Sequence, residues 1–240
     1  MRNVRKQTFC LAINSVLIVA ILSILSSTAT ASSSLNIFPP DSKPYGLSYS
    51  EHAQNFWKWA YGIPAKDNPI NDPTGEKCAY GQSLTNSSVF MLPINNGGLS
   101  ERTCKVTAGK GLLIPVMQVA ISDKEYPGAS VEQLSESAKK DQDSVNSLYL
   151  KIDDKEYNYQ DLLKYRTHTQ PFEVIIANNG VFGIVEGGPS KVVADGFYII
   201  TEPLQKGTYQ IQFKSSLICT GEECAEANFV QDIKYNIIAE

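Results

Sequence analysis

TYQIQFKSS, residues 208–216, alternates apolar and polar side chains. The residues expected on its buried face are Tyr209, Ile211 and Phe213. FVQDIKYNII, residues 229–238, repeats the pattern, and its expected inward residues are Phe229, Ile233, Tyr235 and Ile237. A period of two residues predicts strands that are buried on one face. Because several such segments are separated by turns, the sequence predicts a mainly β protein, an antiparallel β-sandwich of jelly-roll or immunoglobulin-like type.

Further strands are expected upstream of these two. Residues 111–121 are almost continuously apolar, which predicts a strand buried on both faces. LYLKI (148–152) and KEYNY (155–159) flank Asp153 and Asp154 and predict a hairpin, although its turn contains no glycine. The segments PFEVIIAN (171–178) and GFYIIT (196–201) are also predicted strands.

Two amphipathic helices are predicted to pack on the sandwich. The first covers about residues 49–61, because Ser48 and Glu51 fit a capping box and Gly62 provides a stop. Its sequence includes FWKWAY, and the spacing directs Phe56 and Trp57 into the core. The second helix is expected at about 130–147, where Ser130 and Gln133 form another capping box and apolar residues recur at helical spacing.

The N-terminus predicts export. MRNVRKQ carries only positive charges, an apolar run follows, and SSTATA ends in small residues, so residues 1–31 are predicted to be a cleaved signal peptide, with an uncleaved anchor as the alternative. Residues 32–47 read as an extended leader and 48–240 as one domain. No membrane span is expected in the mature chain. Cleavage would remove three positive charges and change the net charge from −4 to −7, which argues against nucleic acid or anionic membranes as partners.

The cysteines fit an exported protein. Of the five, Cys10 lies in the signal, and the mature chain keeps an even number: Cys78, Cys104, Cys219 and Cys224. Four cysteines allow three pairings, and closeness in sequence favours Cys78–Cys104 and Cys219–Cys224. Free thiols are the alternative, whereas a zinc site is disfavoured because the chain has no C-x-x-C motif.

Three segments together resemble a family of exported bacterial and archaeal proteins of no known activity. They are WKWAYGIPAKDNPINDPTGEKCAYGQ from residue 57, RTCKVTAGKGLLIPV from residue 102, and DGFYIITEPLQKGTYQIQF from residue 195. The shared patterns are W-x-W-A-x-x-I-P, D-x-T-G-x-x-C, R-x-C, and an Asp-Gly-aromatic strand before a P-L-x-x-G turn. The resemblance implies no catalytic residue. It implies that Cys78 and Cys104 belong to a shared framework.

The sequence contains no strong catalytic pattern. The only histidines are His52 and His168, and no G-x-S-x-G motif occurs, which disfavours a serine or cysteine hydrolase. A second enzymatic alternative is an extracellular hydrolase that cleaves polysaccharide with clustered carboxylates. The densest cluster is Asp153, Asp154, Glu156 and Asp161, although acids around a turn are usually solvated.

Two kinds of binding site are considered. Oxygen-bearing side chains in a turn-rich loop suggest a calcium site, without matching the twelve-residue calcium loop; they are Asp67, Asn68, Asn71 and Asp72. Aromatic rings that are exposed would suggest carbohydrate binding, and the alternative is that the same rings are packed in the core. The candidates are Trp59, Tyr61, Tyr157, Tyr159 and Tyr165.

The function expected from the sequence is therefore a non-enzymatic binding or structural protein of the cell envelope or extracellular space. Carbohydrate is the best specific ligand, and an accessory subunit of an envelope complex is a further alternative. The expected binding residues are Trp59, Tyr61, Asp67, Asn71 and Asp72. Asn86 lies in a glycosylation sequon, no cofactor beyond the calcium alternative is expected, and partners would be a glycan or an envelope protein.

Overall fold

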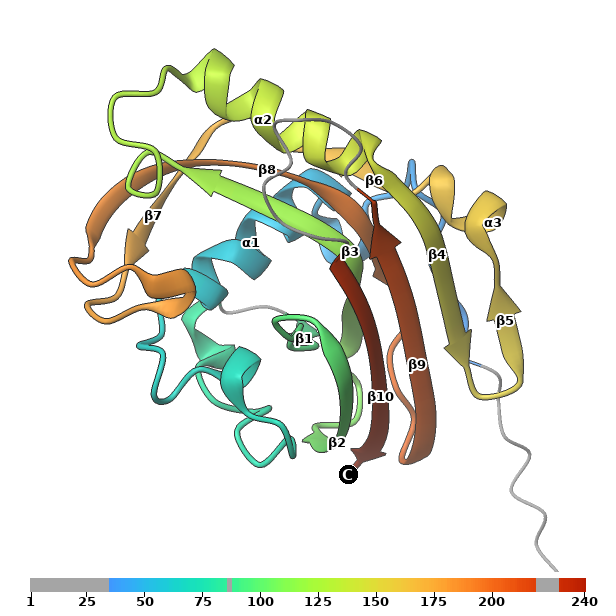
Figure 1. Ribbon diagram of the computed structural model, residues 1–240. Coiled ribbons are helices and arrows are strands. Elements are labelled where there is room, and N and C mark those ends of the chain that lie inside the picture. Colours follow the sequence, from blue (N-terminus) through green and yellow to red (C-terminus); the bar gives the residue numbers. More distant parts are fainter. Residues whose placement is uncertain (1–34, 86–87, 219–228) are drawn as a thin grey trace, which may run out of the picture. The chain divides into compact units, whose positions relative to one another are not determined.

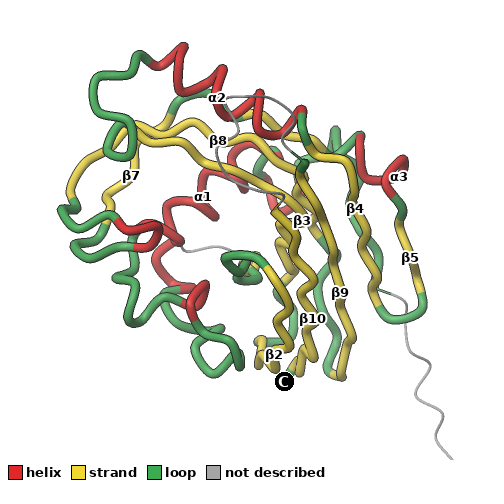
Figure 2. The backbone as a smooth tube through the Cα atoms, viewed as in Figure 1, coloured by secondary structure: helices red, strands yellow, loops and turns green. Residues whose placement is uncertain are grey.

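The computed structural model describes residues 35–85, 88–218 and 229–240, which belong to one compact unit, Ser34–Glu240. This unit is mainly β, as predicted, and its strands form two sheets (Figures 1 and 2). The first sheet has the order β1-β3-β8-β6, and β7 also pairs with β8. The bounds of its strands are β1 Val89–Met91, β3 Gly111–Ser122, β6 Arg166–His168, β7 Phe172–Ile176 and β8 Gly188–Ile200.

The second sheet has the order β2-β10-β9-β4-β5. Its strands are β2 Gly98–Val106, β4 Val145–Ile152, β5 Lys155–Tyr157, β9 Gly207–Leu217 and β10 Phe229–Ala239. The alternation that predicted β9 is confirmed, since Tyr209, Ile211 and Phe213 are all buried. In β10 the inward positions Ile233, Tyr235 and Ile237 are buried too, while Phe229 is only partly buried.

The prediction of a purely antiparallel arrangement is wrong, because β1 pairs with β3, and β2 with β10, in parallel. The chain leaves the first sheet after β1, contributes β2 to the second sheet, and returns as β3, so β3 regains the direction of β1. Side-chain alternation determines which residues are buried but not the direction of a strand. The jelly-roll or immunoglobulin-like type stays a prediction.

Helix α1, Tyr49–Tyr61, forms where it was predicted. The Ser48 hydroxyl accepts a hydrogen bond from the Glu51 N–H, and the Glu51 carboxylate accepts one from the Ser48 N–H at 2.8 Å. Helix α2, Val131–Asp143, is capped in the same way by Ser130. Its predicted extension to residue 147 is wrong, because the apolar residues Val145 and Leu148 are buried in β4 instead.

A third helix, α3, Tyr159–Leu163, replaces the second half of the predicted strand KEYNY. Asn158 accepts hydrogen bonds from the N–H groups of Gln160 and Asp161, and the Asp161 carboxylate accepts one from the Asn158 N–H, which completes a capping box. The first half of the segment is β5, and it pairs with β4 across Asp153 as predicted. Asp153 adopts the left-handed backbone (φ 51°) that this turn needs.

Helices α1 and α2 cover opposite faces of the first sheet (Figure 1). Val193 of β8 packs with Leu134 and Ala138 of α2, whereas its neighbours Val192 and Ala194 belong to the main core with α1. Strands covered on both faces need apolar residues at consecutive positions. This double cover explains the almost continuous apolar run of β3, which is buried over most of its length.

The segment expected as a leader packs against the end of β8. Ile37 forms a bridge with Thr201, the Phe38 N–H donates to the Ile200 carbonyl at 2.9 Å, and Leu35 is buried. A short 3-10 helix, η1 Pro44–Gly46, then leads into α1. No helix among the described residues is long and apolar enough to cross a membrane.

Candidate functional site

The two aromatic residues predicted to bind ligand are buried. Trp59 and Tyr61 are both 0% exposed, so the expected exposure is wrong. Trp59 donates from Nε1 to the Tyr80 carbonyl at 3.0 Å, which holds the following loop against α1. Tyr165 is also buried, and Tyr157 and Tyr159 are half-buried. Fully buried rings have no face to present to a sugar.

Three of the four predicted calcium-binding side chains, Asn68, Asn71 and Asp72, accept hydrogen bonds from protein donors. Asn68 is buried: its amide donates to the carbonyls of Ala60 and Ile63 at 2.7 and 3.0 Å, and its Oδ1 accepts from the Ile70 N–H. Asn71 donates to the Ala65 carbonyl. No group of three or more His, Cys, Asp or Glu residues within the described ranges is placed to hold a metal ion, which leaves the calcium alternative unsupported.

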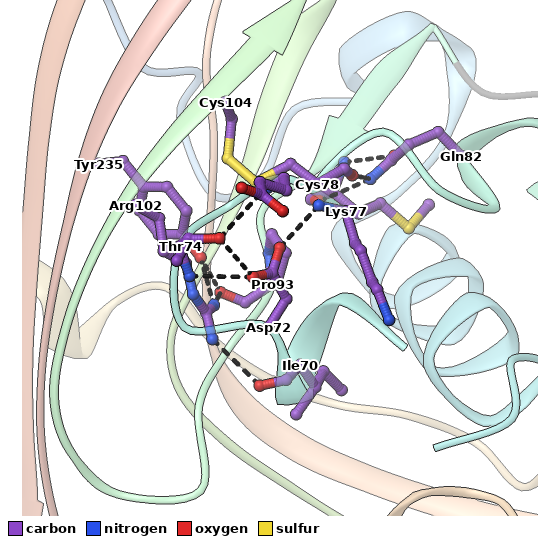
Figure 3. The surroundings of a disulfide bond; sticks show 12 residues. Ile70, Asp72, Thr74, Lys77, Cys78, Gln82, Pro93, Arg102, Cys104 and Tyr235 are labelled. Atoms are coloured by element: carbon purple, nitrogen blue, oxygen red, sulfur yellow. Dashed lines mark hydrogen bonds between the residues drawn. A yellow bond between two sulfur atoms is a disulfide. The ribbon is translucent and has the colours of Figure 1, made fainter. Parts of the chain in front are cut away.

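Asp72 and Asp67 differ in environment. Asp72 accepts hydrogen bonds from the Thr74 N–H and hydroxyl at 2.9 Å and from the Lys77 N–H at 2.6 Å (Figure 3). Burial alone would raise the pKa of Asp72, but these hydrogen bonds outweigh it and the pKa lies below its usual value. Asp67 lies 3.9 Å from the Lys66 ammonium at the surface. The Asp72 carboxylate therefore stabilises the turn that leads to Cys78 by accepting hydrogen bonds from its residues.

Cys78 and Cys104 form a disulfide, with their Cα atoms 5.6 Å apart (Figure 3). Gly75 makes the approach of the two segments possible, since a Cβ there would lie 2.6 Å from the Thr103 carbonyl oxygen and its φ is +92°. The disulfide is compatible with an extracellular protein. The pair Cys219–Cys224, the sequon at Asn86 and the predicted signal at 1–31 lie outside the described residues.

Arg102 extends this cluster into the core (Figure 3). The guanidinium is buried and donates to the carbonyls of Pro93, Ile94 and Ile70 at 2.9–3.1 Å, and to the Tyr235 hydroxyl at 2.9 Å. Arg102 therefore connects three segments: the loop that contains Ile70, the residues Pro93 and Ile94 that follow β1, and strand β10. The D-x-T-G-x-x-C and R-x-C segments thus form one structural cluster.

The predicted carboxylate cluster takes part in local structure. Asp153 accepts a hydrogen bond from the Gln210 N–H at 2.8 Å, Asp161 caps α3, and Glu156 pairs with Lys151 at 3.1 Å. His52 is buried in α1, where Nε2 lies 2.9 Å from the Pro44 carbonyl and burial lowers its pKa. The second histidine, His168, lies on a different element, strand β6.

A pocket of about 370 Å³ opens along a free part of β3. Among the described strands, β1 pairs only with Gly111–Leu113 on that side of β3, so no described strand pairs there with the later stretch that lines the pocket. The volume lies within the range of about 300–1,000 Å³ typical of small-molecule sites. Its polar lining residues are Asn95, Asn96, Gln118, Glu125 and Asp141, and its aromatic ones are Trp57, Tyr126, Phe182 and Phe229.

Glu125 is a partly buried carboxyl group of this pocket, and its pKa is raised. Its Oε2 accepts hydrogen bonds from the Ser122 hydroxyl at 2.6 Å and from the Tyr61 hydroxyl at 3.1 Å. Burial raises the pKa of Glu125 above its usual value, against the hydrogen bonds from Ser122 and Tyr61. Asp141 of α2 lines the same pocket, and burial raises its pKa as well. Carboxyl groups with raised pKa in a cavity are typical of functional sites.

Phe182 and Tyr126 give the pocket exposed aromatic surface, since 42% and 53% of these residues are accessible. Phe182 holds a left-handed backbone (φ 60°) in a short 3-10 helix, η4 Val181–Gly183, a conformation that is strained for a bulky residue. Its ring packs on Trp57 and Tyr61, with centroids 6.1 and 5.8 Å away. Helix α1 thus supports the Phe182 ring of the pocket through Trp57 and Tyr61.

Sequence reasoning missed this pocket. Tyr126 and Phe182 lie in irregular segments, and Glu125 is one acid among many in the sequence. The sequence Asn178-Asn179-Gly180 predicts a turn before Phe182, but it does not predict a pocket. Comparisons with protein-family models, with curated proteins and with solved structures found no match.

Proposed function

We propose that the protein is an exported binding protein that takes part of a carbohydrate into the pocket beside β3. The observation that carries the proposal is the combination of two exposed rings, Phe182 and Tyr126, with carboxyl and amide groups in one pocket. Sugars offer apolar ring faces that stack on aromatic side chains, and hydroxyls that both donate and accept hydrogen bonds. The N-terminal sequence and the Cys78–Cys104 disulfide support export.

The polar groups of the pocket match a neutral, hydroxylated ligand. The raised pKa of Glu125 and Asp141 reflects a setting that disfavours charge, so these groups are suited to hydrogen bonding rather than to ion pairing. Gln118 also lines the pocket, and its buried Oε1 has no hydrogen-bond partner among the described residues. A rotation of this amide would direct that acceptor to a ligand hydroxyl.

A glycan array, followed by calorimetric titration of the best sugar, tests the proposal. Phe182→Ala and Tyr126→Ala should each weaken binding about tenfold, because each removes one stacking ring. Tyr80→Ala is the matched control, since Tyr80 is 50% exposed but does not line this pocket. Equal binding by all three variants would contradict the proposed site, and an array without binding would contradict carbohydrate as the ligand.

If the protein is a polysaccharide hydrolase, this pocket is a better candidate for its active site than the acids at 153–161. The acids at 153–161 make local contacts, whereas the raised pKa of Glu125 is the property expected of a general acid in glycoside hydrolysis. Incubation of the bound oligosaccharide with the protein separates the two functions. Release of shorter sugars that stops in Glu125→Gln would make the protein an enzyme, and an unchanged sugar supports binding alone.

A further inference from the structure

A serine, a histidine and an aspartate contact one another in that order on the side of the first sheet that α2 covers. Ser135 belongs to α2, His168 to β6 and Asp195 to β8, three elements that pack together (Figure 1). The Ser135 hydroxyl oxygen lies 2.9 Å from Nε2 of His168. Nδ1 of the same ring lies 3.3 Å from Oδ2 of Asp195.

The partners determine the tautomer of His168. Asp195 pairs with Arg166 and, as a carboxylate, can only accept hydrogen bonds, so Nδ1 of His168 carries the proton. Nε2 of the neutral ring is then an acceptor, and the Ser135 hydroxyl donates to it. A serine inside a helix can donate to the carbonyl four residues earlier, whereas this one lies within hydrogen-bond distance of an imidazole.

Asp195 is fixed in place. It is 1% exposed and accepts hydrogen bonds from Nε and Nη2 of Arg166 at 3.0 and 2.9 Å. Arg166 is itself held by Asp143 at 2.6 Å and by the Lys139 carbonyl at 3.1 Å. The base is therefore oriented by a buried, immobilised acid, while the serine and the histidine remain accessible. A serine, a histidine and an aspartate in this order of contact match the arrangement of a catalytic triad, whatever their order in the chain.

We propose that Ser135, His168 and Asp195 form a second functional site, which hydrolyses small esters with good leaving groups, such as aryl esters of short acids. Among the described residues, no pair of free backbone N–H groups faces Ser135, because it lies inside a helix, so substrates that need little oxyanion stabilisation are favoured. The exposed Lys139, one turn after Ser135, is the cation nearest along the helix to assist the developing negative charge.

The reaction balances with water as the second substrate. The Ser135 Oγ bonds to the acyl carbon as its proton moves to Nε2 of His168, and the carbon–oxygen bond to the aryl group breaks as that proton passes to the leaving oxygen. Water then bonds to the acyl carbon, giving one proton to Nε2. The bond to Ser135 breaks, and the proton returns to its Oγ. One ester and one water yield one carboxylic acid and one phenol.

Hydrolysis of p-nitrophenyl acetate and labelling with a fluorophosphonate probe, both on the intact oxidised protein, test this proposal. Ser135→Ala and His168→Ala should lower the rate above buffer by about 10²-fold or more, and added imidazole should restore part of the rate in His168→Ala. Ser137→Ala is the matched control on the same helix and should keep the native rate. Peptide mapping should place the label on Ser135.

Several outcomes would overturn the proposal. They are a native rate equal to that of buffer, a rate in Ser135→Ala equal to the native rate, or a label that maps to another residue. The native rate in Lys139→Ala would overturn the role given to Lys139. Ser135 and His168 are accessible, and circular dichroism of both variants shows whether a lost rate comes with a native fold. Failure of sugar binding in the pocket leaves this test unaffected.

Discussion

Removal of the Cys78–Cys104 disulfide should cost the protein a large part of its stability. The two residues are 26 positions apart in sequence, and the chain-entropy relation then gives about −12 cal/mol/K for the closed loop in the unfolded chain, or about 3.5 kcal/mol at 25 °C. Both cysteines are buried, so Cys78→Ala with Cys104→Ala keeps the core apolar. For domains with a total stability of ~5–15 kcal/mol, this loss is substantial.

Urea unfolding followed by tryptophan fluorescence measures the effect, because Trp57 and Trp59 are both buried in α1 and become exposed on unfolding. The midpoint of the double variant should fall by roughly 1.2–3.5 M urea, given slopes of about 1–3 kcal/mol/M. The native protein treated with dithiothreitol should shift toward the same midpoint.

The double variant treated with dithiothreitol is the control, because it retains Cys219 and Cys224. A further shift in that control reports on those two residues and is subtracted from the effect on the native protein. An oxidised native protein that unfolds at the same midpoint as the double variant would refute the argument that this bond constrains the unfolded chain.

Three further predictions concern buried groups. Asn68→Ala should destabilise the protein by about 3 kcal/mol in urea unfolding, because three hydrogen bonds to a buried amide are lost, whereas the exposed Asn71→Ala should cost less than about 1 kcal/mol; equal losses would contradict this. Trp57→Ala should cost about 3–5 kcal/mol, and an unchanged Tm would show that the ring is dispensable. The pKa of Glu125 is raised above 4.5, so the folded state binds its proton more tightly and this stabilisation is lost as pH rises from about 4.5 through the folded pKa. As the pH rises through this range, the Tm of Glu125→Gln should therefore increase relative to the Tm of the native protein. A difference in Tm that does not change with pH would argue against a raised pKa.

Local signals in the sequence predicted the elements whose structure depends on local chemistry. Ser48 with Glu51 and Ser130 with Gln133 determine where α1 and α2 begin, and both capping boxes are present. The same rule applied to Asn158 and Asp161 would have found α3. The end of α2 was not predictable in this way, because Val145 fits a helix stripe and a strand equally well, and pairing with β9 decides between them.

The parallel strand pairs and the site depend on contacts between distant segments. Nothing in the sequence near Gly98 shows that β2 will lie beside β10. The exposure of Trp59 was mistaken for a similar reason: its position at the edge of the apolar stripe left it free in an isolated helix, but the loop that carries Tyr80 and Gly81 closes over it. Burial by a long loop has no periodic signature.

The segments around Trp57, Asp72 and Arg102 mainly build the core, although Trp57 also lines the pocket. Trp57, Trp59, Asp72, Arg102 and the disulfide build a buried framework, and none of them presents a chemically free group to solvent. The exposed aromatic rings and the Glu125 carboxyl of the pocket come from the turn after β3 and from the strained turn at Phe182, whereas Gln118 and Asp141 come from β3 and α2. Since loops vary more easily than the core that supports them, proteins with the same framework are expected to differ in ligand at the positions of Glu125, Tyr126 and Phe182. Exchange of these two turns between such proteins should transfer ligand preference while the urea midpoint stays that of the framework.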